Sequence, residues 1–113
     1  MPNDKDRLLD VLQAARRALG YVRGKTRRDF IEDPLLQDGV IRRLEIIGEA
    51  VRRISDEARA ELPELPWRDM TSMRNLLIHE YNDVDLGMVW DTVQNDLPKL
   101  VSALENILPP EEK

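Results

Sequence analysis

The fold is decided by residues 35–55, LLQDGVIRRLEIIGEAVRRIS, in which apolar side chains recur every three or four positions. This spacing places them on one stripe of an α-helix with 3.6 residues per turn. Gly48 costs about 1 kcal/mol relative to alanine in a helix interior, so it indicates close packing of a second helix. Arg42 and Arg43 lie off the stripe and are expected to face solvent, a partner chain or RNA. The stretch predicts a helix from Leu35 to about Ser55, with the stripe Val40, Ile41, Leu44, Ile47, Ala50, Val51 and Ile54.

The residues before this stretch predict a second long helix and a short one. Apolar residues at helical spacing run from Asp4 to about Arg23, and Gly24 is a plausible stop. The sequence Thr26–Asp29 has the form of a capping box, which predicts a short helix. Asp33-Pro34 then suits the cap and first turn of the long helix.

The residues after the stretch predict two more helices. Residues 58–65 are acidic and less regular, and a helix is expected from about Asp69 to Tyr81. Asp83 or Asp85 can cap a last helix, in which Pro98 predicts a kink or a brief break. Residues 109–113 read as a frayed tail. We therefore expect an all-α, antiparallel four-helix bundle with one additional short helix, forming a single domain over residues 1–113.

Composition narrows the class of protein. The 113 residues include one histidine and no cysteine, which excludes disulfides, thiolate metal sites and multi-histidine sites within one chain. We expect no metal and no cofactor. No apolar run approaches the roughly 18 residues of a membrane span, so a soluble, cytoplasmic protein is expected, with no membrane partner.

The net charge of −5 is unfavourable for a protein that binds RNA, because affinity for phosphates comes from lysine and arginine. The charges are unevenly distributed, however. They permit either solvated helix faces or a local basic groove, with basic residues at Arg16, Arg17, Arg23, Lys25, Arg27, Arg28, Arg42, Arg43, Arg52 and Arg53.

The candidate functional stretch is residues 74–81, RNLLIHEY, which holds the only histidine. At roughly 100° per residue, a helical wheel separates two sides of this helix. Met70, Met73 and Leu77 form a core stripe. A different sector holds the polar side chains together with one apolar residue, and its members are Arg74, Asn75, Ile78 and His79.

These residue types suit RNA cleavage without a metal. Histidine transfers protons near neutral pH, and the planar guanidinium of arginine binds a phosphate with two hydrogen bonds. Asn75, four residues before His79, can orient the imidazole or a phosphate. Cleavage needs a base and an acid, while one chain supplies one histidine, so a two-fold homodimer is favoured.

The stretch also resembles a known family. An arginine, four residues, a histidine, one residue and a tyrosine on a helix resemble the HepT-like branch of the HEPN superfamily. The similarity extends to residues 41–50, Trp67–Met70, Val84-Asp85 and Val89-Trp90.

This resemblance implies a toxin of a toxin–antitoxin system, an endoribonuclease acting on RNA, with tRNA the expected class. It implies catalytic roles for Arg74 and His79, a supporting role for Asn75 and a cleft shared by two protomers. A cognate minimal nucleotidyltransferase antitoxin would silence the nuclease by attaching AMP to Tyr81.

Other interpretations remain open on the sequence. The chain could be a non-catalytic subunit that presents substrate to a nucleotidyltransferase, or a plain structural or dimerisation bundle. His79 could equally be a helix cap or a surface residue, and Tyr81 a packing residue with its hydroxyl in water.

Overall fold

The structure is a computed structural model that describes residues 2–72 and 84–108 of the chain. Its helices are α1 (Pro2–Val22), α2 (Arg27–Ile31), α3 (Pro34–Arg52), α4 (Asp56–Glu61), α6 (Leu86–Asp91), the π-helical segment η1 (Thr92–Asp96) and α7 (Leu97–Ile107). Residues 67–72 are also helical. The described residues contain no strand, which confirms the prediction of an all-α helical bundle.

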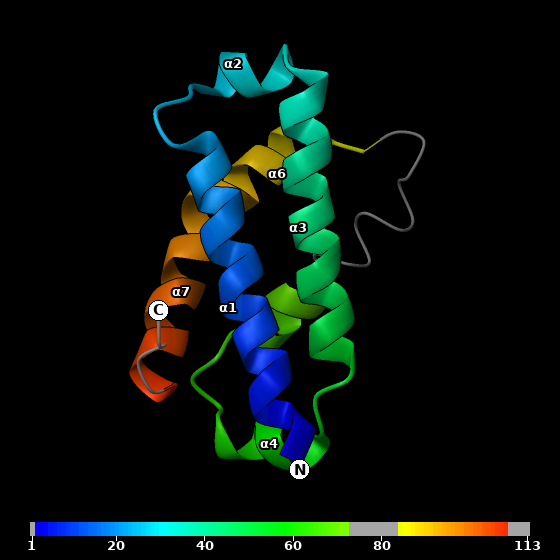
Figure 1. The fold of residues 1–113 in the computed structure, drawn as a ribbon, viewed down its shortest axis with the longest axis vertical. Coiled ribbons are helices and arrows are strands. Elements are labelled where there is room, and N and C mark those ends of the chain that lie inside the picture. The colour runs from blue at the N-terminus through cyan, green and yellow to red at the C-terminus, as the bar shows by residue number, and fades with distance from the viewer. Residues whose placement is uncertain (1, 73–83, 109–113) are drawn as a thin grey trace.

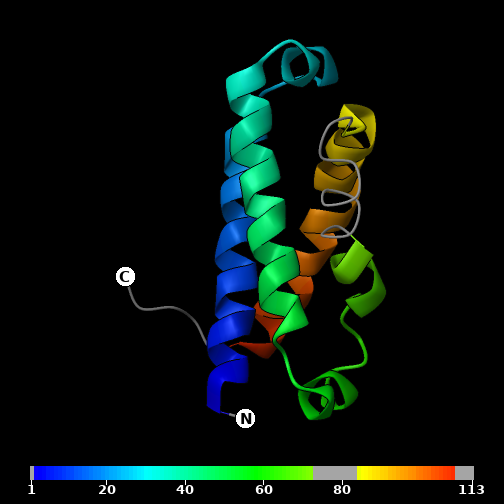
Figure 2. The same cartoon turned by 90° about the vertical axis from the view of Figure 1, so that its right-hand side faces the viewer.

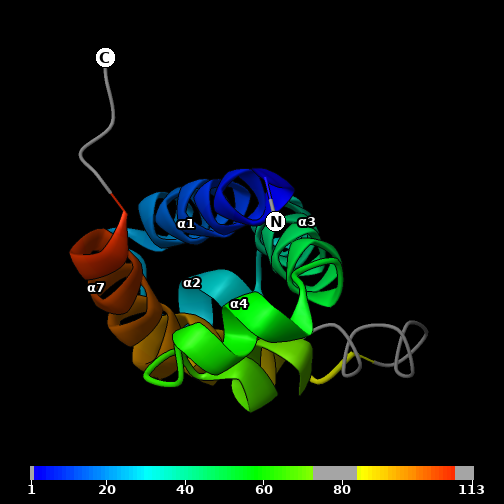
Figure 3. The ribbon, with the colours of Figure 1, turned by 90° about the horizontal axis from the view of Figure 1, so that it is seen from below.

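The helices are arranged around one core. Helices α1 and α3 lie side by side and antiparallel along the long axis of the molecule (Figure 1). The α6–η1–α7 run covers the opposite side (Figure 3), and α2 crosses the end of the bundle where α3 begins (Figure 2). The helix expected over 69–81 is described only up to residue 72. None of the described helices is long and apolar enough to cross a membrane.

Local residue pairs fix the start of α2 and α3, as the sequence predicts. The chain turns at Gly24, whose φ of 76° is a conformation that glycine adopts without strain. Thr26 and Asp29 form the capping box, because each side chain accepts a hydrogen bond from the other residue's backbone N–H. Asp33 caps α3 by accepting from Leu36 N at 3.1 Å, and Pro34 occupies the first turn.

The end of α3 differs from the prediction. The helix ends at Arg52 and not near Ser55, because the next backbone N–H groups bond to carbonyls only three residues back. Ser55 then caps α4, a helix in the stretch expected to be irregular. Its Oγ accepts from Ala58 N at 3.1 Å and donates to Asp4 Oδ2 at 2.7 Å. A long-range contact with α1 therefore stabilises a helix that local sequence did not predict.

The last helical run has its expected break. Pro98 lacks an N–H, and its ring would clash with the carbonyl of Gln94 in a regular α-helix. The chain accommodates this by widening into the π-helical turn η1 before α7 resumes at Leu97. The predicted interruption near Pro98 is confirmed, and it lies just before the proline.

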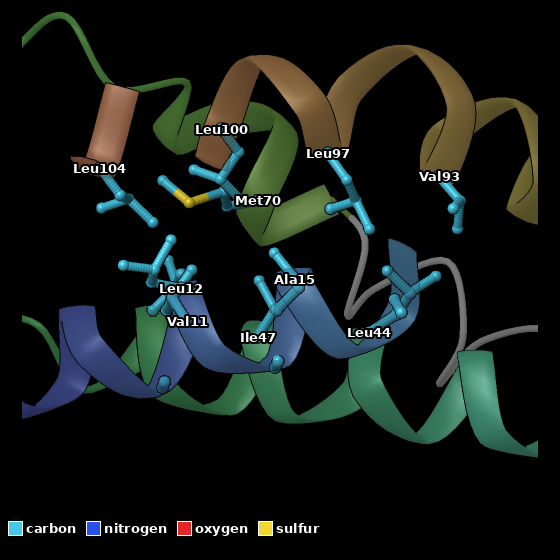
Figure 4. Close-up of a cluster of buried hydrophobic side chains, with 14 of the residues drawn as sticks. Val11, Leu12, Ala15, Leu44, Ile47, Met70, Val93, Leu97, Leu100 and Leu104 are labelled. Carbon is cyan, nitrogen blue, oxygen red and sulfur yellow. The ribbon is translucent and has the colours of Figure 1, made fainter. Parts of the chain in front are cut away.

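The core contains the predicted stripes of all these helices. Phe30, Leu44, Ile47, Val93 and Leu97 are almost fully buried, and Figure 4 shows several of these side chains meeting between α1, α3 and the last run. Ile41 of the predicted stripe is only partly buried, as are Leu19 of α1 and Val101 of α7, while Leu100 of α7 is fully buried.

Candidate functional site

The predicted site residues lie outside the described part of the chain. Arg74, Asn75, His79, Tyr81 and the predicted contact residue Ile78 all belong to residues 73–83. The described residues on either side show how the two ends of this segment are attached to the bundle.

The N-terminal attachment is Trp67, which contacts Leu62 and Arg59 directly and is joined to α3 through Arg59. The Trp67 indole N–H donates to Leu62 O at 2.8 Å, and the Arg59 guanidinium lies 5.3 Å from the centre of the Trp67 ring. Arg59 Nη2 also donates to Val51 O at 2.7 Å, at the end of α3. A guanidinium over an indole face is attracted by the ring quadrupole, so these contacts fix the start of the 67–72 helix against α3 and α4.

Met70 docks this helix in the core. Its side chain is fully buried, and Figure 4 shows it beside Leu100 of α7. The helical wheel predicted a core position for Met70, which is confirmed; Met73 and Leu77, the other members of that stripe, lie outside the described residues.

The C-terminal attachment is the start of α6. Val84 is half-buried against the core, and Asp85 caps α6 by accepting from Met88 N at 3.1 Å. Phe30 of α2 packs on Trp90, with ring centres 5.7 Å apart. The predicted cap is therefore made by Asp85, and α6, which follows the segment, packs against α2.

A second contact joins α2 to α6. Arg27 Nη1 pairs with Asp91 Oδ1 at 3.0 Å, and the Arg27 guanidinium lies directly over Gly87. A Cβ at Gly87 would stand 2.5 Å from Arg27 Nη2, so this ion-pair geometry depends on the glycine.

Many of the early basic residues are engaged by carboxylates. Ion pairs join Arg16 to Glu105 at 2.7 Å and Arg28 to Glu32 at 3.0 Å, in addition to the pair made by Arg27. Exposed basic residues for which the described chain shows no ion pair are Arg17, Arg23 and Lys25. The described residues thus do not form a continuous basic groove along α1 and α2. For much of this cluster the other interpretation holds, namely helix faces whose charged side chains lie in solvent and pair with carboxylates.

The neighbouring residues Arg42 and Arg43 of α3 differ in how far they are buried. Arg42 is exposed and lies 3.7 Å from Glu45, and Arg52 lies 3.7 Å from Glu49. Arg43 was expected to face outward like Arg42, but it is half-buried, and its Nε is enclosed without a hydrogen-bond partner in the described chain. Its position beside the core stripe explains this, since its aliphatic stem covers apolar surface.

A carboxyl near the start of the candidate segment has an altered pKa. Burial raises the pKa of Asp96, and the negative charge of Asp69 raises it further, while Lys99 opposes the shift. Sequence reasoning did not single out this pair, because Asp69 and Asp96 are distant in sequence and meet only through packing of the 67–72 helix near η1.

Comparison with known proteins identifies what this chain resembles. The profile of the family described as "Ribonuclease HepT-like" matches residues 11–107, which include the whole candidate segment. A protein of Thermococcus cleftensis named "Probable ribonuclease HepT" is 41% identical over 103 residues, covering 91% of this chain and 94% of that relative.

Two further relatives extend the comparison. A protein of Caldanaerobacter subterraneus that is also named as an RNase is 35% identical over 112 residues. The match covers 99% of this chain and 100% of that relative. A Methanocaldococcus jannaschii protein, whose name joins gamma-glutamylcyclotransferase to a provisional RNase, is 43% identical over 88 residues. The match covers 78% of this chain but 40% of that larger protein. No solved structure gives a significant match.

Proposed function

Because the chain belongs to the HepT-like ribonuclease family, we propose that it is a metal-independent endoribonuclease that cleaves RNA through Arg74 and His79. The observation that carries this proposal is the family match over residues 11–107, within which the arginine, the histidine and the tyrosine of the motif are all present. The relatives named as ribonucleases cover most of the chain, which supports the same activity.

The proposed reaction is attack of a ribose 2′-oxygen on its own phosphorus. One imidazole accepts the proton of the 2′-hydroxyl as the new P–O bond forms, and a second, protonated imidazole donates a proton to the departing 5′-oxygen. The products are a 2′,3′-cyclic phosphate and a 5′-hydroxyl, so atoms and charge balance without a metal or other co-reactant. Arg74 would stabilise the charge on the phosphoryl oxygens, and Asn75 would orient His79 or the phosphate.

The need for two imidazoles supports a homodimer. Each chain carries one histidine, so a two-fold pair of chains supplies both the base and the acid. On the helical wheel Ile78 falls in the polar sector, away from the side that buries Met70, where a second chain could cover it. We place the dimer contact along this helix, with the two His79 side chains facing a shared cleft.

We further propose that the protein is the toxin of a toxin–antitoxin pair acting in the cytoplasm, with tRNA as its RNA class. A cognate nucleotidyltransferase would attach AMP to the Tyr81 hydroxyl. An anionic adduct two residues from His79 would repel RNA phosphates and occupy their cleft. This proposal requires an accessible Tyr81 and an active nuclease before modification.

The test is cleavage of a defined RNA by purified protein in the presence of a chelator. The unchanged chain is expected to cut, and His79→Ala to lose about 10²–10⁴-fold in rate, the usual effect of removing a general acid or base. Matched circular dichroism spectra would show that the variant keeps its helices. If cleavage disappears in chelator and returns with magnesium, the metal-independent mechanism is wrong. A chain that binds but never cuts RNA would instead favour the non-catalytic partner subunit.

A further inference from the structure

Two adjoining pockets follow α7 toward the end of the bundle opposite α2 (Figure 1). The first has a volume of about 650 Å³ and opens between the start of α1, α4 and the end of α7. The second, of about 580 Å³, lies between α7 and Glu64, in the turn that follows α4. Ile107 lines both pockets, so together they form one depression, which we call the α4–α7 groove.

The floor of this groove is apolar. Two of its apolar side chains are buried and four are half-buried, and the six are Leu8, Ala58, Leu62, Ala103, Ile107 and Leu108. Half-buried apolar side chains stay partly in water, so a partner that covers them gains free energy. Each pocket has the volume of a typical ligand site, which suits apolar side chains inserted from a partner.

Helix α4 presents its carboxylates to the first pocket and its arginine elsewhere. Glu57 and Glu61 line the pocket, both are exposed, and the described chain shows no ion pair for either. Arg59 lies on the other side of α4, where its guanidinium contacts Trp67 and Val51 O. The arginine of α4 therefore does not neutralise the two glutamates at the pocket.

A third carboxylate, that of Asp4, belongs to the same lining. Hydrogen bonds from the Ser55 side chain and backbone lower the pKa of Asp4, so it stays ionised at neutral pH. Lys5 is the one cation among the described residues that line this pocket. Three carboxylates thus face one ammonium group.

The second pocket continues this excess of negative charge. Its charged lining residues are Glu64 and Lys99. Burial and the charge of Asp69 raise the pKa of Asp96, while Lys99 lowers it, so Lys99 lies among carboxylates rather than in a basic patch. The α4–α7 groove as a whole therefore favours a positively charged occupant.

Charge also disfavours three other occupants. RNA would be repelled, because affinity for phosphates comes from lysine and arginine. A two-fold contact between two copies of the chain would bring the same carboxylates face to face. Residues 109–113 follow the groove in the chain, but they contain Glu111 and Glu112 against a single Lys113, so their charge does not complement it.

The length of the groove indicates a polymer rather than a small cation. Its α7 residues run from Pro98 to Leu108, which corresponds to about 15 Å at a rise of 1.5 Å per residue. A small cation would occupy one pocket and leave the other empty. A helical segment of about ten residues matches this length, and amphipathic helices bind apolar grooves in this way.

We propose that the α4–α7 groove binds a short, cationic, amphipathic helix of another protein. The apolar side of that helix covers Leu62 and Ile107, and its lysine or arginine side chains face Glu57 and Glu61. The inference goes beyond the proposed function and does not depend on RNA cleavage.

The probes are synthetic peptides titrated into ¹⁵N-labelled full-length protein and followed by NMR. The first peptide has about twelve residues, with leucines at helical spacing and lysines beside them. A second peptide replaces the lysines with glutamates, and a third replaces the leucines with alanines. The first is expected to shift the amide signals of Glu61, Leu62, Ala103 and Ile107, and to bind more weakly as salt is raised. The other two should bind at least several-fold more weakly.

Variants of the protein test the same two contacts. Glu57→Gln combined with Glu61→Gln removes both carboxylates at nearly constant shape and should weaken binding about fivefold. Asp10→Asn combined with Asp38→Asn is the matched control, because it makes the same change in net charge at exposed positions outside the groove, and should leave the affinity unchanged. Ile107→Ala should weaken binding about tenfold, the effect of losing one apolar contact. The alanine peptide tests that apolar contact without altering the protein.

Several results would overturn the inference. Equal binding of the lysine and glutamate peptides would do so, as would the absence of shifts at these positions up to about 1 mM peptide. An undiminished affinity of the Glu57→Gln, Glu61→Gln chain would contradict the role of the carboxylates. A single-stranded RNA that shifts the same signals of the His79→Ala chain would assign the groove to RNA. Sedimentation showing a dimer that the double glutamine variant loses would assign it to a second copy.

RNA cleavage by the purified chain is measured separately from peptide binding. A chain that never cleaves RNA would contradict the proposed function and leave the expected peptide results unchanged. Retained cleavage without peptide binding would contradict the further inference alone.

Discussion

Truncation of Met70 tests how the candidate segment is attached to the bundle. Met70 is the last core side chain described before the motif, and it is fully buried beside α7 (Figure 4). Met70→Ala removes three heavy atoms from a packed environment and leaves a cavity unless the helix shifts. Such substitutions cost about 2–5 kcal/mol in free energy of unfolding.

This loss in free energy of unfolding corresponds to a fall in melting temperature, Tm. A domain of this size loses roughly 4 °C for each kcal/mol, so Met70→Ala should lower Tm by about 8–20 °C. Met88→Ala is the matched control, because the same atoms are removed from a side chain that is 50% exposed. Its free energy of unfolding should stay within about 0.5 kcal/mol of the unchanged chain.

Two assays separate stability from function. Thermal unfolding followed by circular dichroism gives Tm, and RNA cleavage well below Tm gives the rate of the folded protein. Met70→Ala should reduce the cleavage rate more than Leu12→Ala does, because Leu12 is a similarly buried core residue of α1, whereas Met70 lies in the 67–72 helix that leads into the candidate segment. Equal melting temperatures for Met70→Ala and Met88→Ala would refute the burial of Met70. Equal cleavage rates for Met70→Ala and Leu12→Ala would refute its role in holding the segment.

Three further predictions concern single residues. Trp67→Phe keeps an aromatic side chain but removes the indole N–H that donates to Leu62 O, and should cost at least about 0.5–1.5 kcal/mol in free energy of unfolding. An unchanged midpoint in chemical denaturation would contradict that contact. The Ser55 hydrogen bonds lower the pKa of Asp4, so its stabilisation is present above about pH 3.8 and is lost as pH falls through the lower folded-state value. Asp4→Asn should therefore flatten the fall in stability below that pH, and an acid unfolding curve parallel to that of the unchanged chain would argue against it. Tyr81→Phe should prevent AMP attachment by the cognate nucleotidyltransferase while cleavage persists, and mass spectrometry showing AMP on the variant would move the modification elsewhere.

Features set by neighbours in sequence were predictable. The capping box at Thr26, the Asp33-Pro34 start of α3 and the Asp85 cap each involve residues at most three positions apart. The apolar stripes were equally readable, because helical periodicity alone determines which side of each helix is buried.

Features set by distant residues were not predictable. Helix α4 depends on Ser55, whose hydrogen bonds to Asp4 join residues 51 positions apart. The Arg16–Glu105 pair joins residues 89 positions apart, so charge counts along the chain overstated the basic surface available to RNA. Leu100 of α7 is buried beside Met70 of the 67–72 helix, a contact between residues 30 positions apart (Figure 4).

In the candidate site, too, some features were predictable from the sequence and others were not. The order of residue types around Arg74, His79 and Tyr81 sufficed to indicate a family, and the match over residues 11–107 confirms that assignment. The packing that attaches the segment emerged only from the structure, since the Trp67 indole bonds to Leu62 O beneath Arg59, and Phe30 of α2 packs on Trp90 beyond the predicted Asp85 cap. The roles of the motif residues themselves remain predictions for experiment.

The most direct test of the central claim is the chemistry of the cut ends. RNA treated with the purified chain in chelator should be analysed by mass spectrometry beside RNA treated with His79→Ala. The proposed mechanism predicts 2′,3′-cyclic phosphate ends, or their hydrolysis product, paired with 5′-hydroxyl ends, and neither at a comparable rate from the variant. Products carrying 5′-phosphate and 3′-hydroxyl ends would contradict attack by the 2′-oxygen and with it the proposed roles of Arg74 and His79.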